Sequence, residues 1–251
     1  MPADAAPLLV FDFDGVLVDG MPEYWWSARA AALQLAPQLQ LQQEAPAAFA
    51  RLRPLIHKGW EMVLMAAELG RADLDLEELL ADYDGALPMA LARWGWAAEQ
   101  LQGQLEQVRS AAIAADPEAW LARHRLFPGV KERLARLAGE GADWAVLTTK
   151  GAFFASRLLA AAGLEPRALF GHEHGSKSEV LRTLLAQERP LWFVEDRRPT
   201  LETVRADPSL ASVRCFLVSW GYLGPRDSQG LPASIAWLTP ERFAAPLAQW
   251  P

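Results

Sequence analysis

Two carboxylates near the N-terminus, two positions apart at the end of an apolar run, are the residues of this chain best suited to chemistry. Residues 8–13 read LLVFDF, and five of these six positions are apolar or aromatic, which is typical of a short buried strand. Asp12 lies inside the run, and Asp14 and Gly15 follow it. Carboxylates in such a place are costly to bury unless a cation compensates their charge. The pair therefore predicts a site of chemistry at the end of this strand.

Two later apolar runs also end in polar side chains. Residues 144–147 (WAVL) precede two threonines, and residues 191–194 (LWFV) precede two acids. In parallel sheets, ligands bind beyond the carboxyl ends of the strands, so these side chains are candidates for the same site. The four candidates are Thr148, Thr149, Glu195 and Asp196.

The strand-like runs alternate with helix-like stretches, mostly in the second half of the chain. This alternation predicts an α/β fold, in which a central parallel sheet is covered by helices on both faces. The expected strands are 8–13, 144–147, 191–194, 215–218 and 235–238, and the expected helices are 130–137, 153–162, 179–186 and 201–206.

Residues 20–126 interrupt the alternation. This stretch is rich in Ala, Leu, Gln and Glu, has no convincing strand, and contains six of the eleven tryptophans, enough for a small core of its own. We therefore expect a core domain formed by residues 1–19 and 127–251, with an all-helical subdomain inserted between them. The helices expected in the insert are 23–36, 46–68, 76–93 and 97–114.

The composition narrows the class of protein. With 251 residues, 51% hydrophobic residues and a formal charge of −7, the chain is typical of a soluble protein and argues against nucleic acid or an anionic membrane as partner. No stretch is long and apolar enough to span a bilayer, and the N-terminus does not read as a signal peptide. The single cysteine, Cys215, lies in an apolar setting, which favours a buried thiol and a cytoplasmic location.

The sequence DFDGVLVD resembles the first motif of the haloacid dehalogenase (HAD) superfamily, in its phosphatase branch with a helical cap inserted after the first strand. The resemblance implies a Rossmann-like core with a cap subdomain. It also implies that Asp12 is a nucleophile that forms an aspartyl-phosphate, and that Asp14 protonates the leaving alcohol and then activates water.

Later positions match the other motifs of that superfamily. By resemblance, the hydroxyl of Thr148 holds phosphoryl oxygens, with the adjacent Thr149 as the alternative. Lys177, in HGSKSEV, matches the lysine that neutralises the nucleophile and the bound phosphate, and Lys150 is its competitor. We prefer Lys177 because it opens the expected helix.

The same resemblance implies Mg²⁺, held by Asp12, the backbone carbonyl of Asp14, and Asp196. The chain departs here from the common pattern, which has a second acid four or five residues after Asp196. Glu195 is one candidate for the missing acid, and the other is Thr200, acting through water.

The predicted substrate is a small phosphorylated metabolite. Among the members of the superfamily, this chain most resembles the phosphoglycolate phosphatases. Gly15, Thr149, Arg53, His57 and Lys58 are predicted to contact the substrate, the last three from a basic cluster in the insert. Two alternatives stay open: a phosphosugar mutase of the same superfamily, and a non-catalytic binding protein on the same scaffold. The sequence sets neither the substrate nor the oligomeric state.

Overall fold

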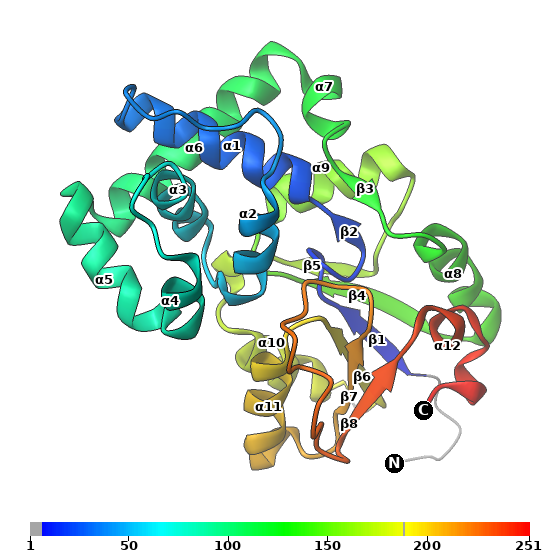
Figure 1. The fold of residues 1–251 in the computed structure, drawn as a ribbon. Helices are drawn as coiled ribbons and strands as arrows, with labels where there is room; N and C mark the ends of the chain where they lie inside the picture. The colour runs from blue at the N-terminus through cyan, green and yellow to red at the C-terminus, as the bar shows by residue number, and fades with distance from the viewer. Residues whose placement is uncertain (1–6, 188) are drawn as a thin grey trace. The chain divides into compact units, whose positions relative to one another are not determined.

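The computed structural model describes residues 7–187 and 189–251, which divide into two compact units (Figure 1). One unit is formed by the chain up to Asp19 together with Arg125–Pro251, and the other by Gly20–His124. We call them the core unit and the helical unit.

In the described part of the core unit, six strands form a parallel sheet in the order β5-β4-β1-β6-β7-β8. The first strand lies at its centre: Leu8 pairs with Asp143 on one side and with Leu191 on the other. The predicted α/β fold and all five predicted strands are confirmed. The bounds of the strands are β1 Leu8–Phe11, β4 Asp143–Leu147, β5 Ala168–Phe170, β6 Leu191–Glu195, β7 Arg214–Val218 and β8 Ile235–Leu238.

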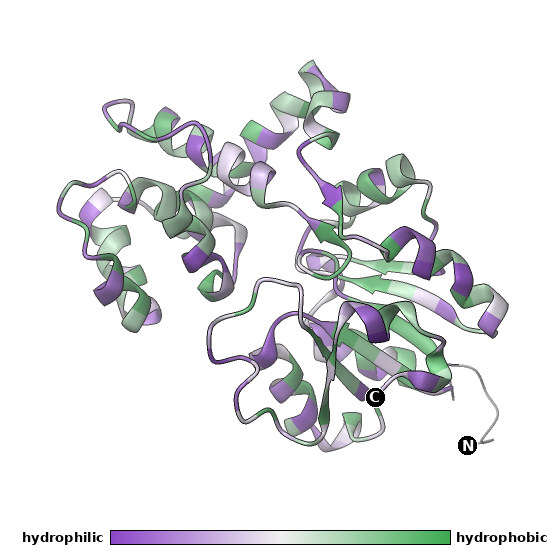
Figure 2. Ribbon diagram, turned by 45° about the vertical axis from the view of Figure 1, so that its right-hand side comes forward, coloured by the Kyte–Doolittle hydropathy of each residue, from purple (hydrophilic) through white to green (hydrophobic). Residues whose placement is uncertain are grey.

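Helices cover both faces of this sheet (Figure 1). Alternate strand residues such as Val10 and Phe193 belong to a buried cluster that includes apolar side chains of α10 and α11. Phe11 points to the other face, where its ring meets those of Trp144 and of Phe243 on α12. The strands are largely hydrophobic along their length, as expected for strands buried on both sides (Figure 2). The helices are α8 Val130–Leu137, α9 Ala152–Ala162, α10 Lys177–Leu185, α11 Arg198–Ala206 and α12 Pro240–Ala244.

A short antiparallel pair was not predicted. The chain turns after Asp12 and forms β2 (Val18–Asp19), which pairs with β3 (Arg125–Leu126). The turn requires a positive φ of 89° at Gly15, where glycine is favoured.

The helical unit contains helices throughout, as predicted, but two of the predicted helices are broken. The stretch 46–68 forms α2, a short 3₁₀ turn at Arg53–Leu55, and α3, because Pro54 cannot continue the hydrogen bonding and the Glu61 carboxylate accepts the backbone N–H of His57 (2.7 Å). The stretch 76–93 is broken at Asp82, whose side chain caps the following helix. The helices are α1 Met21–Leu35, α2 Ala47–Leu52, α3 Gly59–Glu68, α4 Leu76–Ala81, α5 Tyr83–Trp94, α6 Ala98–Ala115 and α7 Pro117–Leu121.

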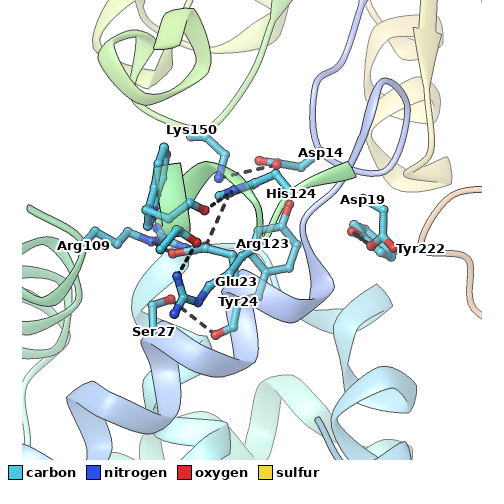
Figure 3. A network of polar contacts seen from close by, with 12 residues as sticks. Asp14, Asp19, Glu23, Tyr24, Ser27, Arg109, Arg123, His124, Lys150 and Tyr222 are labelled. Atoms are coloured by element: carbon cyan, nitrogen blue, oxygen red, sulfur yellow. Dashed lines mark hydrogen bonds and ion pairs between the residues drawn. The ribbon is translucent and has the colours of Figure 1, made fainter. Parts of the chain in front are cut away.

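Helices α1, α3 and α6 pack together and give this unit a core of its own. Trp25 is buried and its ring lies 5.1 Å from that of Phe49. Glu23 is also buried and forms two 2.7 Å hydrogen bonds with the guanidinium of Arg109, which compensates its charge (Figure 3).

Two further sequence expectations can be compared with the structure. Cys215 is buried in β7, and burial raises the pKa of its thiol to about 11, as expected for a structural cysteine. Among the residues that the structure describes, no helix has the length and apolar character to cross a membrane.

Candidate active site

The candidate site lies at the carboxyl ends of three neighbouring strands of the core sheet. Asp12 follows β1, Thr148 follows β4, and Glu195 is the last residue of β6. Because β1 lies between β4 and β6, residues far apart in the chain arrive at one edge of the sheet. The backbone N–H of Asp12 donates to Val194 (2.8 Å), and that of Thr148 donates to Phe170 (2.9 Å), so the sheet hydrogen bonding fixes both positions.

Lys177 joins two of these strand ends. Its Nζ lies 2.7 Å from Oδ1 of Asp12 and 2.6 Å from Oε2 of Glu195. The lysine is the first residue of α10, whose start is fixed by a reciprocal capping box between Ser176 and Glu179. The helix start therefore places one ammonium between two carboxylates.

Glu195 has both of its oxygens engaged. While Oε2 accepts from Lys177, Oε1 accepts the backbone N–H groups of Asp196 (3.0 Å) and Arg197 (3.1 Å), and the residue is fully buried. This places Glu195 as the partner that holds Lys177. The other predicted substitute for the missing acid, Thr200, lies in the first turn of α11, where its backbone N–H donates to Arg197.

The three groups perturb one another's protonation. Burial, followed by the negative charge of Glu195, raises the pKa of Asp12 to about 7, although Lys177 opposes this. Burial would raise the pKa of Glu195 as well, but Lys177 and the two backbone donors hold it below its usual range. Burial by itself would lower the pKa of Lys177, yet the two carboxylates together keep it above its ordinary value. The two carboxylates share one ammonium, and the backbone donors stabilise the charge of Glu195 in addition, which is why the pKa values of the two acids move in opposite directions.

The donor set at this edge fits a hard divalent cation. One carboxylate oxygen from each of Asp12, Glu195 and Asp196 lies within 4.8 Å of the others, and all three residues are buried. Buried carboxylates in such a group require positive charge, and oxygen ligands are those that Mg²⁺ prefers. The residues present could therefore hold such an ion.

The loop that follows β7 contacts the side chain of Asp196. The backbone N–H of Tyr222 donates to Oδ2 of Asp196 (2.8 Å), and the Tyr222 hydroxyl donates to Asp19 (2.8 Å; Figure 3). A Cβ added at Gly221 would overlap the Asp196 side chain and the carbonyl of Gly15. A side chain at Gly15 would meet the carboxylate of Asp196 as well.

These supporting residues were not predicted from the sequence. The sequence feature that could have indicated them is the segment SWGYLG, which begins at Ser219 directly after a predicted strand. Trp220 also contributes, since its Nε1 donates to the carbonyl of Val16 (3.0 Å) in the turn that follows Asp12. Gly15 itself is buried against Asp196, so the structure gives it a packing role, and its predicted contact with substrate stays a prediction.

The two threonines that follow β4 differ in burial. Thr148 is buried and its Oγ1 accepts the backbone N–H of Lys150 (3.0 Å), whereas Thr149 is exposed. The Lys150 side chain reaches toward Asp14, with Nζ 3.5 Å from Oδ1 (Figure 3). The two lysines weighed in the sequence thus face different acids, since Lys177 faces Asp12.

The basic residues predicted to contact substrate lie in the helical unit. Arg53 is half-buried, with its guanidinium 5.1 Å from the ring centre of Tyr24. His57 and Lys58 are exposed, and the His57 ring lies 3.7 Å from Asp84. Their role toward substrate stays a prediction.

The comparisons with known proteins define the class. The family model of the haloacid dehalogenase-like hydrolases matches residues 7–197, which include every candidate catalytic residue. The chain therefore belongs to the haloacid dehalogenase-like hydrolase family, as the sequence motifs predicted, and is an enzyme of the hydrolase class. No curated protein matches it in sequence.

Solved structures share the fold at low identity. A predicted phosphoglycolate phosphatase from Haemophilus somnus 129PT matches with a TM-score of 0.63 and 17% identity, over 96% of each chain. The protein tyrosine kinase A of Mycobacterium tuberculosis matches with a TM-score of 0.59 and 23% identity, over 98% of this chain and 97% of that one. Proteins named for different activities thus share this fold, and the site residues must carry any argument about the reaction.

Proposed function

We propose that this protein is a Mg²⁺-dependent phosphomonoester hydrolase that acts on a small phosphorylated metabolite and is similar to the phosphoglycolate phosphatases. The observation that carries the proposal is the contact of Lys177 with both Asp12 and Glu195 at the edge of the sheet. It places a compensating cation against the predicted nucleophile, in a site that also has the donors for a divalent ion.

In the proposed reaction, a carboxylate oxygen of Asp12 attacks phosphorus while the bond to the alcohol oxygen breaks. Asp14 gives its proton to the departing alcohol, and it then accepts a proton from the water that attacks the aspartyl-phosphate. Inorganic phosphate leaves, and Asp12 is regenerated as a carboxylate. The turn between β1 and β2 keeps the two acids adjacent, because Gly15 and Val18 close it with a 2.9 Å hydrogen bond.

The transferring phosphoryl group develops charge that the site must neutralise. Lys177 supplies one positive charge at the nucleophile, and Thr148 is the proposed hydroxyl donor. Asp12, the carbonyl of Asp14, and Asp196 would hold Mg²⁺, which when bound supplies further positive charge for the phosphoryl oxygens. Glu195 contributes its charge beside this ion and keeps Lys177 in place.

We further propose that the helical unit acts as a cap that selects the substrate, with Arg53, His57 and Lys58 among the selecting residues. In family members of this kind the cap would determine which phosphomonoester is accepted, while the core unit performs the chemistry. The protein would work in the cytoplasm, where its single buried thiol stays reduced.

The test is release of inorganic phosphate from a panel of small phosphomonoesters, with and without Mg²⁺, for the wild type and for Asp12→Asn. Release that needs both the metal and Asp12 would support the proposal. Turnover by Asp12→Asn at the wild-type rate would refute the nucleophile assignment. Transfer of the phosphoryl group within a sugar phosphate without release would indicate a mutase, and neither release nor transfer would indicate a binding protein.

A further inference from the structure

A glutamate that the proposed reaction does not use joins two of the loops that carry candidate catalytic residues. The first loop, residues 148–151, follows β4 and begins with Thr148; we call it the β4–α9 loop. The second, residues 171–176, follows β5 and ends directly before Lys177; we call it the β5–α10 loop. Because β4 and β5 are neighbours in the sheet, the two loops leave it side by side. Glu173 lies in the β5–α10 loop.

Glu173 caps α9 from this neighbouring loop. The N-cap residue of α9 is Gly151, and a glycine has no side chain with which to accept the first backbone donors of the helix. The Glu173 carboxylate accepts the N–H of Ala152, the first residue of α9, at 3.0 Å and across 21 positions of sequence. Its negative charge also interacts favourably with the dipole at this end of the helix. Glu173 therefore supplies the cap that a glycine cannot.

Backbone contacts hold the two loops together beside this cap. The N–H of His172 donates to the carbonyl of Lys150 (3.4 Å), and the N–H of Lys150 donates to Oγ1 of Thr148 (3.0 Å). A Cβ added at Gly171 would overlap both the first nitrogen of α9 and the carboxylate of Glu173, so the close approach of the loops requires a glycine there. A continuous set of contacts thus runs from the β5–α10 loop to the hydroxyl of Thr148.

The β5–α10 loop is itself fixed at both ends. At its start, Nδ1 of His174 accepts the first backbone N–H of the loop (3.1 Å). At its end, the N–H of Ser176 donates to the carboxylate of Glu179 (2.7 Å), in the capping box that fixes the start of α10. A loop held in this way transmits the position of Glu173 to Lys177.

From these contacts we infer that Glu173 is a positioning residue that sets the separation between the Thr148 hydroxyl and the Lys177 ammonium. The inference rests on the proposed phosphatase function and deepens it, because these are two of the groups proposed to neutralise the transferring phosphoryl group. Without the cap, the two loops are free to take other relative positions. The fraction of molecules in which both groups meet the phosphoryl group then falls, and the apparent affinity for it falls in proportion.

The first test compares kcat/KM for the best substrate of the phosphomonoester panel in Glu173→Ala and Glu173→Gln. The loss cannot exceed what one capping contact contributes, so we expect Glu173→Ala to lower kcat/KM about 3- to 10-fold. Glu173→Gln keeps an oxygen that can accept the Ala152 N–H and gives up only the 3.5 Å approach to His172, whose side chain is 60% exposed, so it should retain most of the activity.

Asp116→Ala is the matched control. Asp116 is also an exposed acid that caps a helix, since it accepts the N–H of Ala119 in α7 at 2.9 Å. This variant should lose stability much as Glu173→Ala does and keep the wild-type kcat/KM. Circular dichroism checks that each variant is folded.

The second test asks whether Glu173 acts through the proposed phosphoryl-binding groups. In a Thr148→Ala background one of the two groups is gone, so Glu173→Ala should lower kcat/KM by a smaller factor than in the wild type. A residue with a structural role alone would cost the same factor in both backgrounds, because independent effects multiply.

Hydrogen exchange gives a readout without turnover, on peptides that cover 148–156 and 171–180. Glu173→Ala should speed exchange in both peptides, including the first turn of α10, because the two loops lose a shared contact. Glu173→Gln should exchange like the wild type.

The outcomes separate the inference from the function on which it rests. Equal losses of kcat/KM in the Ala and Gln variants would show that the charge of Glu173 acts and the cap does not, which would overturn the inference while the phosphatase function stands. Losses that multiply in the Thr148→Ala background would overturn it as well. A wild type that releases no phosphate from any substrate would refute the proposed function, and faster exchange confined to 171–176 would then overturn the inference independently.

Discussion

Glu195→Gln tests the central contact of the site, because it removes one negative charge and leaves the shape of the side chain. In the wild type the carboxylate is fully buried, accepts Lys177 at 2.6 Å, and accepts two backbone N–H groups at 3.0 and 3.1 Å. Removing one partner of a buried ion pair costs about 3–5 kcal/mol. The glutamine oxygen can still accept the backbone donors, Lys177 keeps Asp12 as a partner, and loss of the Glu195 charge relieves its repulsion of Asp12, so the loss is smaller than this. We therefore expect a loss of about 2–3 kcal/mol in the free energy of unfolding.

The assay is urea unfolding in EDTA, followed by tryptophan fluorescence. With a dependence of ~1–3 kcal/mol per molar urea, the expected loss moves the midpoint down by about 1 M. Glu202→Gln is the matched control: this residue of α11 pairs with Arg198 at 2.7 Å but its side chain is 44% exposed, so its change should stay within about 0.5 kcal/mol.

Glu195→Gln also tests whether Glu195 contributes to Mg²⁺ binding. Loss of a group that surrounds and orients metal ligands typically weakens metal binding by about 10- to 100-fold, so the Mg²⁺ concentration for half-maximal phosphate release should rise at least tenfold. If Glu195→Gln unfolds at the wild-type urea concentration and needs no more Mg²⁺ than the wild type, Glu195 neither holds Lys177 nor supports the metal, and our account of the site is wrong.

Two other changes test parts of the core unit. Gly221→Ala places a Cβ against the Asp196 side chain, so we expect thermal unfolding to show a loss of about 1–3 kcal/mol in the free energy of unfolding, together with weaker activation by Mg²⁺. The control Gly103→Ala lies in open space on a helix and should not destabilise the protein. Equal behaviour of the two variants would contradict the close approach of Gly221 to Asp196. The hydrogen bond from Arg133, which is fully buried, holds the pKa of Glu140 below its ordinary value of 4.5. Since the folded pKa is the lower one, the stability from this pair is present above pH 4.5 and is lost as the pH falls through the folded pKa. The stability difference between wild type and Glu140→Gln, measured by urea unfolding, should therefore shrink on acidification, and a constant difference would count against the pair.

Much of the fold could be predicted because strands buried on both faces must be apolar along their whole length. The runs that became β1, β4, β6, β7 and β8 all show this pattern. The strand β5 was missed because it is three residues long and only half-buried, so its sequence carries little of that signal. The broken helix at 46–68 was missed because its composition stays helix-like, while the break depends on Pro54 and on the bond from the His57 N–H to Glu61.

The sequence by itself determined which side chains stand at strand ends, since a short apolar run followed by an acid or a threonine is visible in the chain. It also determined the residue types, since the sequence alone makes Asp12, Asp14, Lys177 and Asp196 candidates. It did not determine their partners. Only the tertiary structure showed that the ammonium of Lys177 joins Glu195, 18 positions away, to Asp12, 165 positions away.

The remaining contacts also belong to the tertiary structure. Lys150 faces Asp14, and Gly221 and Tyr222 lie against Asp196, because the strand order brings β4, β1, β6 and β7 side by side. Strand order is set by the packing of the whole sheet and leaves no mark in any local stretch of residues. The sequence therefore defines the chemical groups of this site, and the packing of the sheet decides which of them meet.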